Sequence, residues 1–126
     1  MRSPGTVVCV TADDWLELLQ QTATEIQRSL DTFDGWTEGG DRPDQYLLDQ
    51  VADSAALTVL NSANATVLSE ESGLVSGTTS ETVIIDPVDG STNASRRIPH
   101  YCTSLCVVDG QGPLVGLVLN LSLIHI

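Results

Sequence analysis

Ile84-Ile85-Asp86-Pro87-Val88-Asp89-Gly90-Ser91-Thr92-Asn93 passes within a few residues from an apolar run to a cluster of acids and hydroxyls. The apolar run begins at Thr82, and its continuous β-branched residues predict a strand that is buried on both faces. We expect this strand to stop at Asp86-Pro87, because proline ends regular strand pairing. The stretch therefore predicts a strand, a stiff turn and the start of a helix, in that order.

The turn gathers oxygen ligands. Pro87 stiffens the backbone, so Asp86 and Asp89 can converge on one point while the carbonyl of Val88 faces inward. A second acidic segment, Glu70-Glu71, follows a short predicted strand over residues 66–69. Two carboxylates forced to about 4 Å repel each other by about 4 kcal/mol at an effective dielectric constant of 20. A hard divalent cation is the usual compensation, so the pattern predicts a metal site.

Residues after the second aspartate add a site for an anion. Gly90 lets the backbone approach a ligand closely. Ser91 and Thr92 can start a helical turn whose free amides face an anion. Oxygen ligands beside such an anion cradle are typical of a magnesium phosphate site.

Each part of this pattern also has an ordinary explanation. A Glu-Glu pair is commonly a solvated loop, and Asp89-Gly90-Ser91 alone is commonly a simple turn. A calcium-binding EF-hand loop does not fit, because Val88 and Gly90 stand at the third and fifth positions, where ligands are needed. Only the joint occurrence of both acidic segments at strand ends favours a metal site.

The two segments together resemble the inositol monophosphatase family of lithium-sensitive, magnesium-dependent phosphatases. Ser69-Glu70-Glu71-Ser72 followed by residues 84–93 matches the family's Glu-Glu pair and its Asp-Pro-(Ile/Leu/Val)-Asp-Gly-(Thr/Ser)-x-Asn segment. Arg97-Ile98-Pro99 also fits the family pattern. The specific match spans residues 67–99, and the flanking elements are compatible with it. Ala94 departs from the family, which usually has an aromatic residue there.

This resemblance implies a metal-ligand set. Glu70 and Asp86 would bind a first Mg²⁺ together with the carbonyl of Val88, and Asp86 and Asp89 would share a second. The metals would polarise the phosphoryl oxygens, activate water and stabilise the leaving alkoxide.

The resemblance also implies roles on the substrate side. Gly90, Ser91 and Thr92 would bind the phosphate, and Ser91 would help to activate the attacking water. Asp53 is the expected partner of Ser91 in that step, although its spacing to Glu70 is loose and the family's preceding threonine is absent.

Hydrophobic periodicity places the remaining elements. Apolar residues recur at helical spacing over residues 12–30, and a second helix is expected from near Asp44 to residues 61–64. Further strands are expected over residues 101–108 and 114–121, joined by a hairpin turn at 109–113. The resulting fold class is α/β (α+β), with two N-terminal helices and then strands, and the resemblance implies a truncated, layered αβαβα sandwich.

Composition limits the partners. The 126 residues carry 17 acidic side chains against five arginines, with a formal net charge of −12. Such a surface repels nucleic acid and anionic lipid. Three cysteines without a CxxC pair argue against a disulfide framework and a zinc site. No apolar run is long enough for a signal-peptide core or a membrane span, so we expect a cytoplasmic protein without membrane or nucleic-acid partners.

The family has a third metal-binding aspartate in a Trp-Asp segment far downstream, which is absent from these 126 residues. We therefore expect residues 1–126 to be the N-terminal part of a single domain, inactive alone, whose full-length form is a homodimer. Residues 121–126 equal a translated sequencing adapter and are interpreted as a non-native tail, with a genuine strand tail as the alternative.

The functional expectation is a magnesium-dependent phosphomonoesterase that hydrolyses a small polyol or sugar phosphate. Inositol monophosphate leads among the substrates, while histidinol phosphate, fructose bisphosphate and nucleotide 3′-phosphate stay open. A non-catalytic metal-binding or interaction fragment is the alternative. Trp36 could cover the site as a lid, and Arg97 could pair with nearby acids. The two histidines, His100 and His125, are expected to be structural or exposed.

Overall fold

A computed structural model of the protein describes residues 9, 11–40 and 45–121. The helices are α1 (Ala12–Asp31), α2 (Leu47–Ser62) and α3 (Ser91–Ser95). The strands are β1 (Thr66–Ser69), β2 (Gly73–Val75), β3 (Thr82–Asp89), β4 (Cys102–Asp109) and β5 (Gly112–Asn120).

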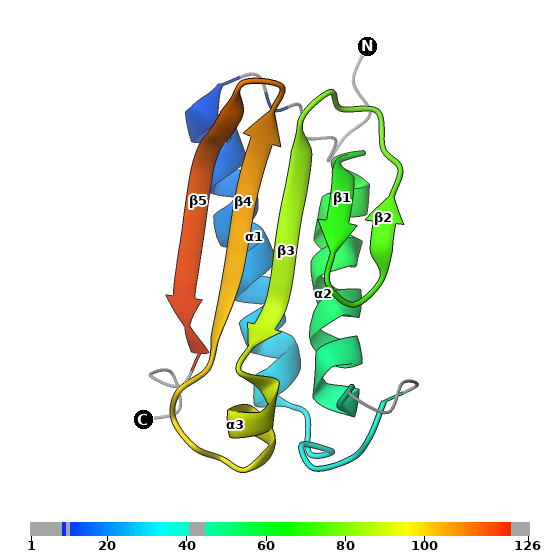
Figure 1. Ribbon diagram of the computed structural model, residues 1–126, viewed down its shortest axis with the longest axis vertical. Coiled ribbons are helices and arrows are strands. Elements are labelled where there is room, and N and C mark those ends of the chain that lie inside the picture. The colour runs from blue at the N-terminus through cyan, green and yellow to red at the C-terminus, as the bar shows by residue number, and fades with distance from the viewer. Residues whose placement is uncertain (1–8, 10, 41–44, 122–126) are drawn as a thin grey trace.

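The molecule has two layers. Figure 1 shows α1 and α2 side by side on one face of a five-stranded sheet whose order is β2-β1-β3-β4-β5. β1 and β3 run parallel, and all other neighbouring pairs are antiparallel. α1 packs on α2, β5 and β4, whereas α2 packs on β3 and β1. The core therefore lies between the helix pair and one face of the sheet.

The sequence dictates where α1 begins and which side it buries. The side chain of Thr11 accepts a hydrogen bond from the amide of Asp14, and the carboxylate of Asp14 accepts one from the amide of Thr11, both at 3.1 Å. This reciprocal capping box satisfies two amides that a helix start leaves unpaired. The apolar positions at helical spacing are the ones that the helix buries: Trp15, Leu18, Leu19, Ala23, Ile26 and Leu30.

The α+β class with two helices before the strands is confirmed, but the sheet differs in detail from expectation. β2 was not predicted, because three residues with an exposed Leu74 carry no periodic signal. β3 does not stop at Asp86 but runs through Pro87 to Asp89, and its pairing with β4 shifts register between these two aspartates. A β-bulge of this kind lets a proline stay inside a strand.

The central strand is also buried on one face only. Val83 and Ile85 are buried, whereas Ile84 between them is 40% exposed. No helix among the described residues covers the other face of β3. The apolar run from Thr82 predicted burial on both faces, but in the described part of the chain only α1 and α2 cover the sheet, on one side (Figure 1).

Two expectations fall outside the described residues. These are Asp44 itself and the tail after Leu121, while Leu121 is buried. The second helix begins at Leu47, later than the expected start near Asp44. Among the described helices, none combines the length and apolarity that crossing a membrane requires.

Candidate active site

Strand register brings the two acidic segments together. In the parallel pair of β1 and β3, Ser69 lies opposite Ile85, and the amide of Glu70 donates to the carbonyl of Ile85 at 3.1 Å. Ser69 and Ile85 are buried toward the helices. Because side chains alternate along a strand, the next residues, Glu70 and Asp86, point to the helix-free face. The structure thus brings together the two carboxylates that the sequence predicted to converge.

The Asp86 carboxyl is strongly perturbed by this arrangement. Its pKa is raised to about 7, mainly by burial, then by the hydrogen bond with Glu70 and its charge, and least by the charges of Asp89 and Glu71. Two carboxyl groups can hydrogen-bond to each other only when they share a proton. Four acids, Glu70, Glu71, Asp86 and Asp89, are thus close enough at one end of the sheet that three of them raise the pKa of Asp86.

These carboxylates lie at one end of an apolar groove. The groove has a volume of about 630 Å³ and runs over the open face of the sheet. Leu68, Ile84 and Val118 line it together with Glu70 and Asp86. The carboxyl groups are thus bordered by apolar side chains, which favours direct ligation over hydration.

The turn after β3 is built around Gly90. Its φ of 90° lies in the left-handed region, and a Cβ atom there would stand 2.8 Å from the carbonyl oxygen of His100. α3 begins directly afterwards, and the amide of Ala94 donates to the carbonyl of Gly90 at 3.0 Å. The amides of Ser91 and Thr92 belong to the first helical turn, where no intrahelical partner exists.

Asp49 on α2 is the acid that meets Ser91. It is 2% exposed, and its Oδ2 accepts a hydrogen bond from the amide of Tyr46 at 3.0 Å. Its Oδ1 is one of two buried side-chain polar atoms without a hydrogen-bond partner among the described residues. Burial raises the pKa of Asp49 to about 6, against the lowering effects of the Tyr46 amide and the Ser91 side chain.

A tyrosine at the start of α2 links the two helices that carry Asp49 and Ser91. The hydroxyl of Tyr46 donates to Oγ1 of Thr92 at 3.5 Å, and hydrogen bonds from Thr92 and Ser95 lower the pKa of this exposed phenol. α2 and α3 are therefore joined next to the proposed anion cradle.

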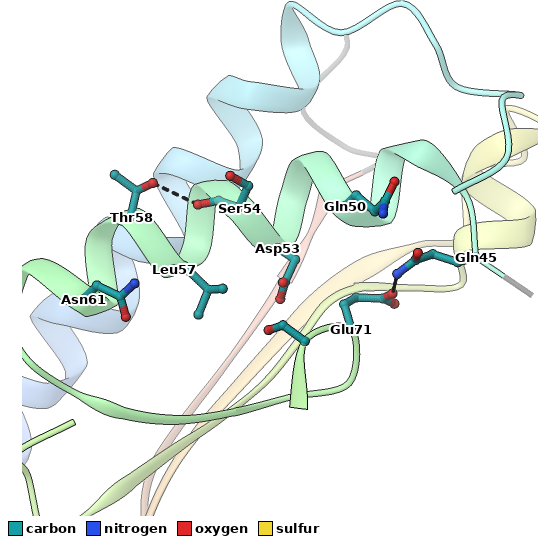
Figure 2. A pocket seen from close by; sticks show the side chains of 9 residues that line it. Gln45, Gln50, Asp53, Ser54, Leu57, Thr58, Asn61 and Glu71 are labelled. Atoms are coloured by element: carbon teal, nitrogen blue, oxygen red, sulfur yellow. Dashed lines mark hydrogen bonds between the residues drawn. The ribbon is translucent and has the colours of Figure 1, made fainter. Parts of the chain in front are cut away.

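Asp53, which the sequence pointed to as the partner of Ser91, lies elsewhere. Its carboxylate accepts a short hydrogen bond from the hydroxyl of Ser69, whose oxygen also accepts one from the amide of Glu71 at 3.1 Å. Figure 2 shows Asp53 extending from α2 toward the turn that carries Glu71, with Gln45 facing Glu71. Asp53 thus lies on the helix side of the sheet, opposite to the face that carries Glu70 and Asp86.

The donor set fits Mg²⁺. Over residues 9, 11–40 and 45–121, no three His, Cys, Asp or Glu side chains are gathered as a ready metal-binding group. Glu70 and Asp86 are nevertheless paired, and Asp89 and Glu71 are close enough to raise the pKa of Asp86. Hard oxygen donors that share a proton are suited to a hard cation, which would replace that proton.

Asp49 was missed because the sequence comparison pointed to Asp53, one helical turn further along α2. With a start near Asp44, Asp49 would lie inside the helix, whereas α2 begins at Leu47 and places Asp49 in its first turn. One signal was available in the sequence. Asp49 and Asp53 both share a helical stripe with the apolar Leu48, Ala52 and Ala56, so the spacing marks two acids and does not choose between them.

The sequence of the chain is similar to those of known phosphatases. The chain is 31% identical over 110 residues to the fructose-1,6-bisphosphatase/inositol-1-monophosphatase of Thermococcus kodakarensis. The aligned region covers 82% of this chain and 43% of that protein. It is also 31% identical over 106 residues to the bifunctional NADP phosphatase/NAD kinase of Methanocaldococcus jannaschii, covering 76% and 18% of the two chains.

A solved structure has the same fold. The extragenic suppressor from Pyrococcus furiosus matches with a TM-score of 0.71 at 28% identity, over 84% of this chain and 44% of that one. The chain thus spans less than half of the length of these relatives. Residues 11–123 match the inositol monophosphatase family. With that match over most of its length, the chain belongs to the inositol monophosphatase family.

Proposed function

We propose that the protein carrying this chain is a magnesium-dependent phosphomonoesterase that acts on a small polyol or sugar phosphate. The observation that carries this proposal is the convergence of Glu70 and Asp86 at the end of the open groove. Relatives named for inositol-1-monophosphatase and fructose-1,6-bisphosphatase activity support the substrate class. Inositol monophosphate is the first substrate to test, and fructose 1,6-bisphosphate the second.

Four residues would hold the metal. Glu70, Asp86, Asp89 and the carbonyl of Val88 supply the oxygen ligands in this proposal. Bound Mg²⁺ would supply Lewis-acid stabilisation of the charge on the phosphoryl group. The amides at the start of α3 would hold the phosphate oxygens, because they have no intrahelical acceptor.

The proton chemistry falls to Ser91 and Asp49. The Ser91 hydroxyl would accept a hydrogen bond from the attacking water and pass the proton toward Asp49. The Asp49 pKa of about 6 keeps this carboxyl largely ionised at neutral pH while leaving it basic enough to accept a proton. Its partnerless Oδ1 is the atom available for that proton. Asp53 would act at a distance, by holding the Ser69 turn that carries Glu70 and Glu71.

A magnesium titration tests the proposal. Purified full-length protein should release phosphate from inositol monophosphate or fructose 1,6-bisphosphate with Mg²⁺, should lose that activity in excess chelator, and should be inhibited by Li⁺. Asp86→Asn should nearly abolish turnover, whereas Asp13→Asn, on the exposed first turn of α1, should leave it intact. Undiminished turnover in chelator would contradict the proposal.

Substitutions on α2 and α3 test the role assignments. Ser91→Ala and Asp49→Asn should each lower kcat much more than they raise KM, because both groups act in the transition state. Asp53→Asn should keep most of kcat and lose stability instead. Comparable losses of kcat in Asp49→Asn and Asp53→Asn would refute this division of roles.

A further inference from the structure

A second cavity lies away from the acidic site. It has a volume of about 350 Å³ and lies where the end of α1, the loop after it and the segment following α3 meet. Its apolar wall comes from Leu30, Phe33, Trp36 and Tyr101. None of Glu70, Asp86, Asp89, Ser91 and Asp49 lines it, so the proposed phosphatase site does not account for it. Its volume is within the range of small-molecule sites.

The aromatic wall is held in place. The indole Nε1 of Trp36 donates to the carbonyl of Phe33 at 2.8 Å. The ring centroids of Trp36 and Tyr101 are 6.0 Å apart with an edge-on interplanar angle of 65°, and those of Phe33 and Trp36 are 6.5 Å apart. Trp36, which could have been a lid over the acidic site, is therefore part of this wall. A fixed aromatic wall offers a flat apolar ligand a preformed surface.

Arg97 lines the same cavity from the turn that ends α3. Its φ of 56° lies in the left-handed region, which is unfavourable for a residue with a Cβ atom. The neighbouring hydrogen bonds hold it there: the amide of Ile98 donates to the carbonyl of Asn93 at 2.8 Å, and Nδ2 of Asn93 donates to the carbonyl of His100 at 3.0 Å. Together with the hydrogen bond from the amide of Arg97 to the carbonyl of Ala94 at 3.0 Å, they form the common left-handed cap at the end of α3, which fixes the backbone of Arg97 beside the cavity.

Opposite charges border the cavity. Arg97 and Asp31 both line it, and Arg97 lowers while Asp31 raises the pKa of the Tyr101 phenol, whose burial is the larger cause of its raised value. Arg97 forms no ion pair with a carboxylate of the described residues, where the ion pair present joins Arg28 to Glu25. A guanidinium without a carboxylate partner is a ready receptor for a carboxylate ligand.

We propose that this cavity binds a free α-amino acid with an aromatic side chain. The ligand carboxylate lies on Arg97, its ammonium group on Asp31, and its ring against Trp36 and Tyr101. A simple anion would be repelled by Asp31 and by the net charge of the chain, and a simple cation would be repelled by Arg97. A zwitterion with an apolar body is complementary to both charges and to the aromatic wall.

Calorimetric titration of the full chain with L-phenylalanine tests the proposal. We expect saturable binding that Arg97→Gln weakens by about tenfold or more, as expected for the loss of a charge-assisted pair. Arg96→Gln removes the same charge one residue away, outside the cavity lining, and should change the dissociation constant by less than about twofold. Arg97→Gly is a second variant, because glycine accepts the left-handed backbone without strain. Absence of saturable binding, or equal effects at positions 96 and 97, would overturn the proposal.

Two analogues separate the contributions of the charges. 3-Phenylpropionate lacks the ammonium group and phenethylamine lacks the carboxylate, so each should bind about tenfold more weakly than L-phenylalanine or worse. Asp31→Asn should abolish the difference between L-phenylalanine and 3-phenylpropionate. Equal affinity of the wild-type protein for these two ligands would refute a zwitterion site. The readout is binding alone, so its outcome is independent of the phosphatase proposal.

Discussion

A single carboxyl group at the start of α2, that of Asp49, should make stability depend on pH. Its pKa is 3.8 in an unfolded chain and about 6 in the folded one, so the folded state holds the proton more tightly. This contribution to the free energy of unfolding is fully present below pH 3.8 and is lost as the pH rises through about 6. Asp49→Asn, which mimics the protonated form, should therefore stabilise the protein by about 2 kcal/mol at pH 7.5 and change little at pH 4.

Urea unfolding at the two pH values measures this effect. The matched control is Asp34→Asn on the exposed loop after α1, which should change stability by less than about 0.5 kcal/mol at either pH. Equal stability of Asp49→Asn and wild type at pH 7.5 would show that the carboxylate is not strained in the fold. The expected gain in stability would accompany a loss of turnover, as is common at active sites.

Gly90 should resist any side chain. Its left-handed φ and the carbonyl of His100, 2.8 Å from a built Cβ, both oppose substitution. Gly90→Ala should lower the free energy of unfolding by about 2–3 kcal/mol, since both the backbone strain and the contact are unfavourable. Gly110→Ala is the control, because a Cβ there meets no atom within 4 Å and should cost less than about 1 kcal/mol. Thermal unfolding of both variants decides between these outcomes.

At the scale of elements, α2 and β1 are coupled through one buried polar contact. Ser69 donates to Asp53, and both side chains are buried. A double-mutant cycle of Ser69→Ala, Asp53→Ala and the double variant should give a coupling energy of about 1 kcal/mol, because a typical intramolecular hydrogen bond contributes about that much net. A coupling energy indistinguishable from zero in denaturant unfolding would remove Asp53 from its proposed supporting role.

How far the sequence could predict these elements depends on periodicity. The run at helical spacing predicts residues 12–30, and α1 spans Ala12–Asp31. The convergence of the two acidic segments is also predictable, because each follows an apolar strand. β2 and the extension of β3 through Pro87 were not predictable, since one lacks a pattern and the other depends on a bulge set by pairing with β4. The meeting of Asp49 with Ser91 joins helices far apart in sequence, which no local pattern reveals.

For the whole molecule, the helix-free face of the sheet has the largest consequences. It exposes apolar side chains, with Val118 70% exposed and Leu74 66% exposed. Exposed apolar sheet surface promotes association. The 126-residue chain expressed by itself should therefore self-associate, and Val118→Lys should shift it toward the monomer in sedimentation velocity.

Gln20→Lys, on the exposed side of α1, adds the same charge away from this face and should leave the association unchanged. A wild-type chain that stays monomeric at high concentration would contradict the expectation. The sequence alone predicted that β3 is buried on both faces. In the described residues its helix-free face is not covered, and Ile84 is 40% exposed there.

Side chains alternate between the two faces of the sheet, so odd-numbered and even-numbered strand residues form two classes. From Thr66 to Ser69, from Thr82 to Asp86 and from Cys102 to Val107, odd-numbered residues face the helices and even-numbered residues face away. A saturation library of these strands, scored separately for cellular abundance and for turnover, should separate by parity. Substitutions at odd positions should deplete the protein. Substitutions at even positions should deplete it less, and those at Asp86, and at Glu70 directly after β1, should remove turnover.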